Sequence, residues 1–171
     1  MDAFNEYIVE RKKSPKDYLT IAGMIFGALV LMFIMLMFSK YLASFLLLLV
    51  VAVVYFLYIG ITLFNVEYEY SVTNGDIDID KIAARRKRSR VVSVHSRTFE
   101  YFAPLTDEHK QAFNDTGITK RMDLTSNSGT DKVYFAVYHK NNNKICIMFE
   151  PTEKMVDDFS RNVPRRVFFR R

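Results

Sequence analysis

Two long apolar segments near the start of the chain limit its fold more than any other feature. The first is TIAGMIFGALVLMFIMLMF (Thr20–Phe38) and the second is LASFLLLLVVAVVYFLYIGITLF (Leu42–Phe64). Each is long enough to cross a hydrocarbon core about 30 Å thick. Neither has a polar face to show to water, which disfavours a buried hairpin in a soluble protein. We therefore expect two transmembrane helices.

The chain must reverse between these segments. One unbroken helix through both would be about 70 Å long, more than twice the thickness of the hydrocarbon core. The tripeptide SKY (Ser39–Tyr41) separates them and offers polar groups that reach interfacial water. A cleaved signal peptide is a poor alternative, because the first segment is long and the second follows at once. The prediction is a transmembrane helical hairpin.

Cationic residues flank the apolar segments unevenly. RKKSPK (Arg11–Lys16) precedes them, KIAARRKRSR (Lys81–Arg90) follows them, and the turn holds only Lys40. An excess of lysine and arginine marks the cytoplasmic side of a membrane protein. We expect a multi-pass protein of the plasma (inner) membrane with both termini in the cytoplasm.

Composition divides the chain into three parts. Between Tyr18 and Phe64 the only charged residue is Lys40, whereas the rest of the chain from Asn65 onward holds 19 basic and 15 acidic residues. The expected boundaries are 1–17 for a cytoplasmic N-terminal segment, 18–64 for two spans at about 20–38 and 42–64, and 65–171 for a soluble domain. In the N-terminal segment, Phe4 and Ile8 are one helical turn apart. This spacing favours a short amphipathic helix that rests on the bilayer or docks on the domain, and a frayed terminus is the alternative.

The clearest soluble signal is NVEYEYSVTNGDIDIDKI (Asn65–Ile82), where apolar and polar residues alternate as in a half-buried strand. Asn74-Gly75 is the pair that a two-residue type I′ turn prefers. The cross-strand pairs that this turn predicts are Val72–Ile77, Tyr70–Ile79, Ser71–Asp78 and Glu69–Asp80. The hydrophobic pattern and the turn therefore select the same register.

This register crowds acidic side chains on the solvent face, and like charges opposite one another destabilise a hairpin. A following antiparallel strand from ARRKRSRVVSV (84–94) would place cations beside these acids, in exposed pairs worth about 0–1 kcal/mol each. The same run is the first candidate for binding anionic lipid headgroups or a protein partner. Its cations are Arg85, Arg86, Lys87, Arg88 and Arg90.

Two further motifs are candidate contact sites. RRVFFRR mixes cations with apolar residues, which suits a membrane surface, while a final edge strand with a charged tail is the alternative. Its cations are Arg165, Arg166, Arg170 and Arg171. GMIFG places Gly23 and Gly27 at a spacing that lets helices approach closely. We expect these glycines to pack against Ala43, Ser44 or Ala52 of the second apolar segment, and a homodimer face is the alternative.

The remaining pattern indicates a β domain that ends in a helix. KVYFAVYHK (132–140) is apolar on both alternations and should be a central strand, KICIMFE (144–150) returns beside it, and TKRMDLTS (119–126) is a weaker strand. After Pro151, apolar residues at helical spacing predict a helix over about 152–163, which Pro164 ends.

This order of elements resembles the pleckstrin-homology-like (PH-like) modules of small bacterial membrane proteins, in which a two-span hairpin leads directly into a sequence such as EYEYSVTNGDIDID. More narrowly, FNEYIVERKKS, YEYSVTNGDIDID and FEPTEKM make the whole chain similar to an uncharacterised family of such proteins from Gram-positive bacteria. The resemblance implies an α+β membrane protein: a transmembrane helical hairpin, then an antiparallel PH-like β domain capped by a C-terminal helix. It implies no catalytic residues.

No catalytic or metal-binding pattern is visible. The three histidines, His95, His109 and His139, are scattered, and Cys146 is a lone cysteine in an apolar strand. The acids of DIDID lack the glycine and glutamate of a calcium loop. The basic run lacks interleaved aromatic residues for stacking on nucleic-acid bases. We expect no enzyme, no cofactor, no metal and no nucleic-acid partner.

The function expected from the sequence is that of a membrane-anchored, non-enzymatic binding or scaffold protein. Its PH-like domain would meet a protein partner or anionic lipid headgroups at the cytoplasmic face. The alternative is a structural subunit of a larger membrane complex, assembled through the apolar helices, with a homo-oligomer as one form of such an assembly.

Overall fold

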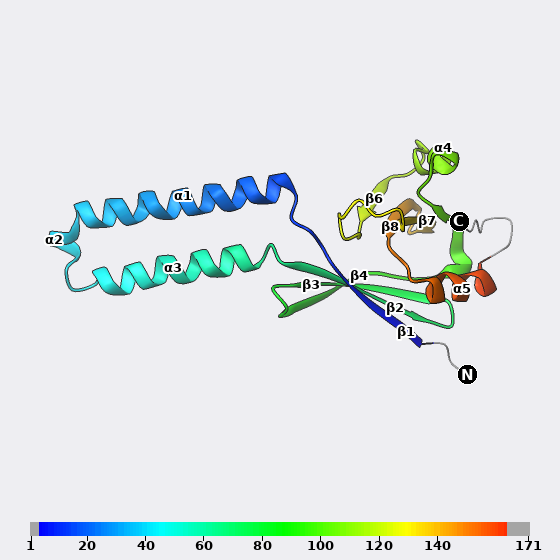
Figure 1. The fold of residues 1–171 in the computed structure, drawn as a ribbon, viewed down its shortest axis with the longest axis horizontal. Helices are drawn as coiled ribbons and strands as arrows, with labels where there is room; N and C mark the ends of the chain where they lie inside the picture. Colours follow the sequence, from blue (N-terminus) through cyan, green and yellow to red (C-terminus); the bar gives the residue numbers. More distant parts are fainter. Residues whose placement is uncertain (1–3, 164–171) are drawn as a thin grey trace.

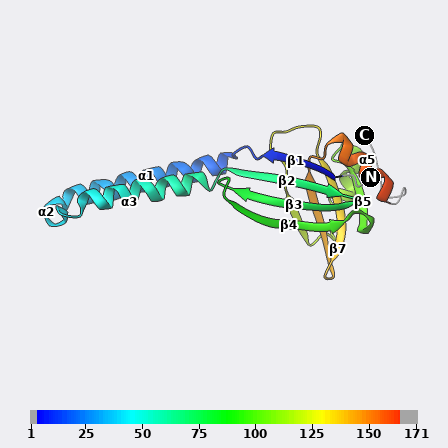
Figure 2. The same ribbon diagram turned by 90° about the horizontal axis from the view of Figure 1, so that it is seen from below.

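A long helical hairpin projects from one end of a β domain (Figure 1). The computed structural model describes residues 4–163. The β domain consists of two four-stranded sheets with orders β1-β2-β3-β4 and β5-β7-β8-β6. The strands of the first sheet run along the same long axis as the hairpin (Figure 2).

The hairpin is formed by α1 (Pro15–Met37), a short helix α2 (Ser39–Leu42) and α3 (Leu46–Thr62). Helix α1 begins earlier than the apolar segment, because Ser14 and Asp17 form a capping box ahead of its first turn. The Oγ of Ser14 accepts a hydrogen bond from the Asp17 N–H at 3.3 Å, and the Asp17 carboxylate accepts one from the Ser14 N–H at 2.8 Å. The reversal is wider than Ser39–Tyr41, since it includes all of α2.

Both long helices turn apolar side chains outward. Helix α1 is long and apolar enough to cross a membrane, and only 6% of its most apolar stretch is buried. Helix α3 is apolar but shorter, with 17 residues. Large side chains such as Phe26, Leu47 and Phe56 are 69%, 79% and 69% exposed. Exposed apolar surface of this extent marks a site of interaction with a membrane or another protein.

The predicted packing of Gly23 and Gly27 against the second apolar segment is wrong. A Cβ atom added to either glycine would meet nothing within 4 Å. The close contact instead involves Gly60 of α3, where an added Cβ would lie 2.2 Å from the Cε of Met24 on α1. Met24 fills the space beside Gly60, so the face of α1 that carries Gly23 and Gly27 is turned away from α3.

The first sheet confirms the predicted hairpin register. It contains β1 (Phe4–Glu10), β2 (Val66–Thr73), β3 (Asp76–Ala83) and β4 (Lys87–His95), all antiparallel to their neighbours. All four predicted pairs between β2 and β3 are present. Asn74 and Gly75 have φ values of 51° and 89°, the left-handed conformations that a type I′ turn requires.

The amphipathic helix predicted for the N-terminal segment is wrong, because Phe4–Glu10 forms strand β1. Tyr7 pairs with Tyr70 and Val9 pairs with Tyr68, and Val9 is 5% exposed. Val9 thus reaches the core, and the backbone of β1 satisfies an edge of β2 that would otherwise be unpaired. The β domain therefore includes residues on both sides of the hairpin, rather than 65–171 alone.

The second sheet contains β5 (Phe99–Pro104), β6 (Lys120–Asp123), β7 (Tyr134–Lys140) and β8 (Asn143–Phe149). Strand β7 is central, as predicted, and Tyr134–Tyr138 is buried throughout. Strand β6 departs from the antiparallel expectation because it pairs with β8 in parallel. The chain crosses between β5 and β6 through two short helices, η2 (Asp107–His109) and α4 (Lys110–Phe113).

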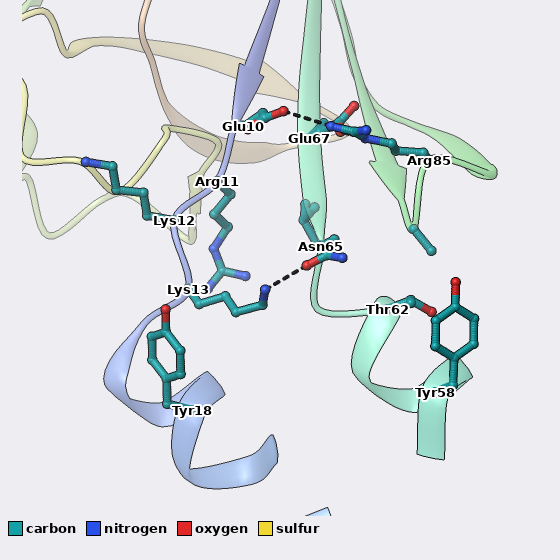
Figure 3. Close-up of a pocket in the computed structure, with 12 residues that line it drawn as sticks. Glu10, Arg11, Lys12, Lys13, Tyr18, Tyr58, Thr62, Asn65, Glu67 and Arg85 are labelled. Carbon is teal, nitrogen blue, oxygen red and sulfur yellow. Dashed lines mark hydrogen bonds and ion pairs between the residues drawn. The ribbon is translucent and has the colours of Figure 1, made fainter. Parts of the chain in front are cut away.

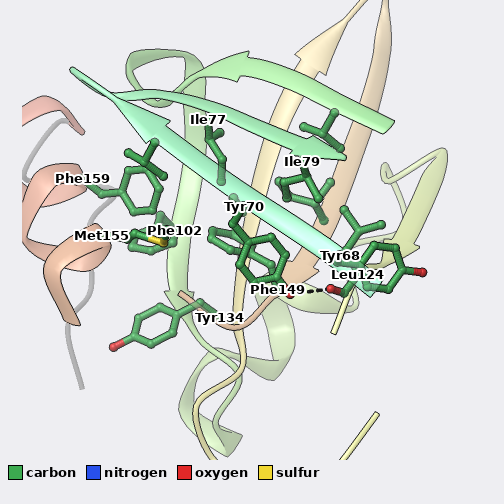
Figure 4. Close-up of a cluster of buried hydrophobic side chains, with 14 of the residues drawn as sticks. Tyr68, Tyr70, Ile77, Ile79, Phe102, Leu124, Tyr134, Phe149, Met155 and Phe159 are labelled. Carbon is green, nitrogen blue, oxygen red and sulfur yellow. Dashed lines mark hydrogen bonds between the residues drawn. The ribbon is translucent and has the colours of Figure 1, made fainter. Parts of the chain in front are cut away.

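The main core lies between the two sheets, and the C-terminal helix closes it (Figure 4). Helix α5 (Glu153–Asn162) lies within the predicted range, and Thr152 caps it by accepting a hydrogen bond from the Met155 N–H at 3.4 Å. The Phe159 ring of α5 packs edge-on against Phe102, with centroids 5.3 Å apart. A short helix, η1 (Ser96–Thr98), leads from β4 into β5. The fold is thus α+β with a C-terminal helix, as expected, and its strand pairing is antiparallel except between β6 and β8.

Candidate functional site

An open cavity of about 860 Å³ lies where the hairpin meets the first sheet (Figure 3). Its walls come from the link between β1 and α1, the end of α3, the start of β2 and the β3–β4 turn. Cations and tyrosines dominate the lining. The residues of these types are Arg11, Lys12, Lys13, Tyr18, Tyr58 and Arg85.

Backbone hydrogen bonds hold the basic link between β1 and α1 in place. The Arg11 N–H donates to the Val66 carbonyl at 2.9 Å, and the Lys12 N–H donates to the Ser126 carbonyl at 2.7 Å. Ser14 then starts α1. Consecutive cations are therefore fixed at the point where the chain leaves the sheet and enters the hairpin.

Asn65 connects the two sides of this junction. Its side-chain oxygen accepts a hydrogen bond from the Nζ of Lys13 at 2.7 Å (Figure 3). Its carbonyl accepts one from the Ala84 N–H at 2.8 Å. One residue between α3 and β2 thus ties the entry to α1 to the turn that begins the basic run.

Arg85 is held by carboxylates of the first sheet. Its Nε donates to Glu67 at 2.8 Å and its Nη2 donates to Glu10 at 3.1 Å. The hydrogen bond to Glu67 is the main cause that raises the pKa of Arg85. In contrast, the next two residues, Arg86 and Lys87, are exposed and make no ion pair within residues 4–163.

The rest of the basic run neutralises acids, as the sequence predicted. Arg88 pairs with Glu69 and with Asp80, the latter at 2.8 Å. Arg90 pairs with Asp80 at 2.6 Å and with Asp78 at 2.7 Å. The hydrogen bond from Arg90, with that from Arg88, holds the pKa of Asp80 below its usual value. Burial raises the pKa of Glu69, and a hydrogen bond with Glu6 adds to this rise.

The comparison with protein families agrees with this architecture. The chain matches the family model described as Bacterial PH-like domain (DUF6106) over residues 1–169. It belongs to this family. No curated protein and no solved structure gives a significant match. The predicted resemblance to a bacterial PH-like family is therefore confirmed, and such a domain favours a binding or scaffold role in general terms. A fold alone does not define an activity, so the finer function must be argued from the site.

The solvent face of the first sheet of this PH-like domain is acidic on balance. Arg85, Arg88 and Arg90 are the arginines that engage it, and acidic side chains outnumber them. The acids are Glu6, Glu10, Glu67, Glu69, Asp76, Asp78 and Asp80. Three of the five predicted contact residues of the basic run are thus occupied within the PH-like domain.

The structure identifies a different set of cations, which make no ion pair within residues 4–163. Lys12 and Lys13 line the cavity from the β1–α1 link. Arg86 of the β3–β4 turn and Lys87 at the start of β4 directly follow Ala84 and Arg85 of that lining in the chain. Together with Lys16 in the first turn of α1, these residues are called the junction cluster below. Sequence reasoning used RKKSPK only for orientation and missed its proximity to the basic run, which depends on the pairing of β1 with the sheet.

The second predicted group of contact cations belongs to the C-terminal segment of the chain. Arg165, Arg166, Arg170 and Arg171 lie outside the described residues. The three histidines have separate partners: Arg97 for His95, Tyr101 for His109 and Glu100 for His139. Within residues 4–163, no group of histidine, cysteine and acidic side chains is arranged to hold a metal ion. Cys146 is buried, and burial raises its pKa to about 11.

Proposed function

We propose that this protein is a non-enzymatic, membrane-anchored scaffold. Helices α1 and α3 insert as a transmembrane hairpin, and the PH-like domain stays at the cytoplasmic face with both termini. There it contacts anionic lipid headgroups and presents its sheets to a protein partner. The observation that carries this proposal is the position of the junction cluster at the end of two apolar, outward-facing helices.

The dimensions of the hairpin fit a bilayer. At about 1.5 Å per residue, helix α1 is about 34 Å long and α3 is about 26 Å long. The first length is slightly more, and the second slightly less, than the thickness of a hydrocarbon core, about 30 Å. The bilayer adapts to the shorter helix by local thinning. Side chains such as Leu47 and Phe56 gain a favourable environment in lipid, since removal of apolar surface from water contributes about 25 cal/mol per Å².

The junction cluster supports contact with anionic headgroups. Its cations make no ion pair within residues 4–163, unlike Arg88 and Arg90, which pair with carboxylates of the first sheet. Cations beside a membrane-spanning segment are attracted to the negative surface of the cytoplasmic leaflet. Tyr18 and Tyr58 of the cavity add the amphipathic rings that favour the membrane–water interface.

The anchoring is tested with single cysteines in a Cys146→Ser background. Lys40→Cys lies at the tip of the hairpin and Arg86→Cys lies at the opposite end. A membrane-impermeant maleimide should label Lys40→Cys in intact cells and should label Arg86→Cys only after lysis. Labelling of Arg86→Cys alone in intact cells would reject the cytoplasmic position of the domain.

The headgroup contact is tested on the full chain, purified in mild detergent, by mass spectrometry of the phospholipids that remain bound. A variant with alanine at Lys12, Lys13, Arg86 and Lys87 should retain a smaller fraction of anionic lipid. A matched control with alanine at Lys120 and Lys140, two exposed lysines of the second sheet, should retain the same fraction as the wild type. Equal fractions in all three proteins would remove the headgroup contact and leave the protein partner.

A structural subunit of a larger membrane complex is the second candidate, and one observation favours it. Gly23 and Gly27 have open space around them on the outward face of α1, which would let a further helix approach closely. Replacement of both by isoleucine should disrupt a co-purifying assembly without unfolding the hairpin, since neither site has a neighbour within 4 Å. An assembly that survives this change would reject the candidate.

A further inference from the structure

Among the strands of residues 4–163, β1 lies at one end of the first sheet, and its outer edge pairs with no other strand. Antiparallel strands alternate residues that bond to the neighbour with residues whose backbone groups point the other way. Arg11 bonds to Val66 of β2, so the odd-numbered residues of β1 face β2. The backbone groups of Glu6 and Ile8 therefore point to the open edge, and no backbone group within residues 4–163 bonds to them there.

A later outward-facing residue shows that this edge can pair. The Lys12 N–H, two positions beyond the end of β1, donates to the Ser126 carbonyl at 2.7 Å. In the part of the chain that the structure describes, the edge is thus covered beyond the strand and unpaired along Phe4–Glu10. A row of unpaired donors and acceptors on an edge strand is a template for another strand.

A groove runs beside this edge. An open cavity of about 1090 Å³ is lined by Asn5, Glu6 and Tyr7 on one side and by residues 130–132 and 150–154 on the other. Its apolar lining includes Tyr7, Tyr134, Pro151 and Val156. An extended chain placed there would have room beside β1, with alternate side chains over an apolar floor.

The charges of the first sheet indicate which side chains a peptide bound at this edge would carry. On the β4 side, Arg88 and Arg90 neutralise the acids of β3 and β2. The β1 side has no such strand within residues 4–163. Arg85 pairs there with both Glu10 and Glu67, whereas Glu6 hydrogen-bonds with Glu69 and makes no ion pair in this part of the chain. Like charges across a sheet are destabilising, and a cation on a neighbouring strand relieves them. The lining of the groove adds three acids, Asp131, Glu150 and Glu153, and two cations, Lys132 and Lys154, so that it is acidic on balance.

We propose that the open edge of β1 binds an extended, basic peptide segment of a partner protein as a fifth strand of the first sheet. The backbone groups of Glu6 and Ile8 supply the hydrogen bonds of this pairing. The carboxylate of Glu6 and the acidic balance of the groove lining select cationic side chains, and the groove over Tyr7 accepts the alternate side chains.

A second copy of the chain does not fit this edge if the hairpin spans the membrane, a step that rests on the proposed function. Two identical β1 edges related by a twofold axis would pair antiparallel. Strand β1 runs toward the hairpin along its axis (Figure 2). Antiparallel pairing would therefore point the two hairpins in opposite directions, whereas both must enter the same membrane.

The test uses the full chain in nanodiscs of zwitterionic lipid, which do not attract a basic probe. The probe is a fluorescent, end-capped peptide of alternating lysine and valine, as long as β1. Fluorescence anisotropy should show saturable binding, and a peptide of alternating glutamate and valine should not bind. Hydrogen exchange at the amides of Glu6 and Ile8 should slow when the lysine peptide is bound.

Variants separate edge pairing from simple charge attraction. Ile8→Pro removes the outward N–H and leaves the bonds to β2 intact, so it should weaken binding about tenfold. Ile8→Ala keeps the N–H and should bind as the wild type does. A lysine–valine peptide with N-methylated backbone should also bind the wild type about tenfold more weakly, which tests the pairing even if Ile8→Pro does not fold.

Equal binding of the methylated and unmethylated peptides, unchanged amide exchange, or full binding by a folded Ile8→Pro variant would each reject the fifth strand. Self-association that slows exchange at Glu6 and Ile8 without peptide would assign the edge to a second copy instead. Both readouts are independent of headgroup binding by the junction cluster, so the two proposals can fail separately.

Discussion

The Asp80 carboxylate of β3 accepts a hydrogen bond from the Nε of Arg90 on β4 at 2.6 Å. A β-bulge makes this pair. Ile79 lies opposite Val92, so a regular ladder would place Val91 opposite Asp80, but the register shifts by one residue and Arg90 takes that position. A bulge re-aims side chains in this way. Here it brings a cation to a carboxylate that is 6% exposed.

Replacement of Asp80 by asparagine should therefore destabilise the β domain by about 1–2 kcal/mol, because a nearly buried, charge-assisted set of hydrogen bonds is lost. Thermal unfolding in mild detergent, followed by circular dichroism, measures the change. Asp78→Asn is the matched control, since the side chain of Asp78 is 34% exposed and should cost less. A cost for Asp78→Asn as large as that for Asp80→Asn would contradict the role given to Asp80.

Asp80 and Glu69 should contribute to the free energy of unfolding with opposite dependence on pH. The pKa of Asp80 is below its usual value of 3.8, so its stabilisation is present above that pH and is lost as the pH falls through the folded-state pKa. The pKa of Glu69 is above its usual value of 4.5, so its contribution is present below that pH and is lost as the pH rises. Glu69→Gln should thus be at least as stable as the wild type near neutral pH, while Asp80→Asn should be less stable.

The hydroxyl of Tyr70 connects the two sheets, because it donates to the Leu124 carbonyl at 2.6 Å in a buried position (Figure 4). Tyr70→Phe should cost about 1–2 kcal/mol, since the carbonyl loses its donor. The Tyr68 hydroxyl makes a longer contact of 3.5 Å with the Asp123 carbonyl, so Tyr68→Phe should cost less. Unfolding in denaturant measures both losses of stability. Equal losses for Tyr70→Phe and Tyr68→Phe would contradict the role given to the 2.6 Å hydrogen bond.

Gly75 should be intolerant of a side chain for two reasons. Its φ of 89° is strained for alanine, and an added Cβ would lie 2.8 Å from the Asn162 side chain and 2.9 Å from the Ser96 Oγ. Gly129 has a φ of 69° but open space around it, so Gly129→Ala reports the backbone strain alone. We expect a larger loss of thermal stability for Gly75→Ala. A smaller loss would mean that α5 shifts away at little cost.

Cys146 should react slowly with alkylating reagents in the folded protein. It is fully buried, and burial raises its pKa to about 11, so little thiolate forms near neutral pH. Unfolding in denaturant should restore the rate of an ordinary thiol. Lys40→Cys in a Cys146→Ser background is the exposed reference. Rapid labelling of Cys146 without denaturant would indicate that the second sheet opens readily at β8.

The features of the fold that the sequence predicts are those set by residues close to one another in the chain. The β2–β3 register follows from two-residue alternation and Asn74-Gly75, because both act between residues close in the chain. The ion pairs of Arg88 and Arg90 follow from the same hairpin, since the next antiparallel strand must lie beside its acids. The central position of β7 follows from apolar residues on both alternations.

Tertiary structure alone decided the remaining features, since they depend on contacts between distant segments. The N-terminal segment is a strand because β2, more than 50 residues later, offers it an edge. The outward position of Gly23 and Gly27 follows from the fit of Met24 beside Gly60. The junction cluster and the open edge of β1 both follow from that one pairing. Local sequence encodes the turns and alternation, and long-range strand pairing determines which charges and edges remain available to partners.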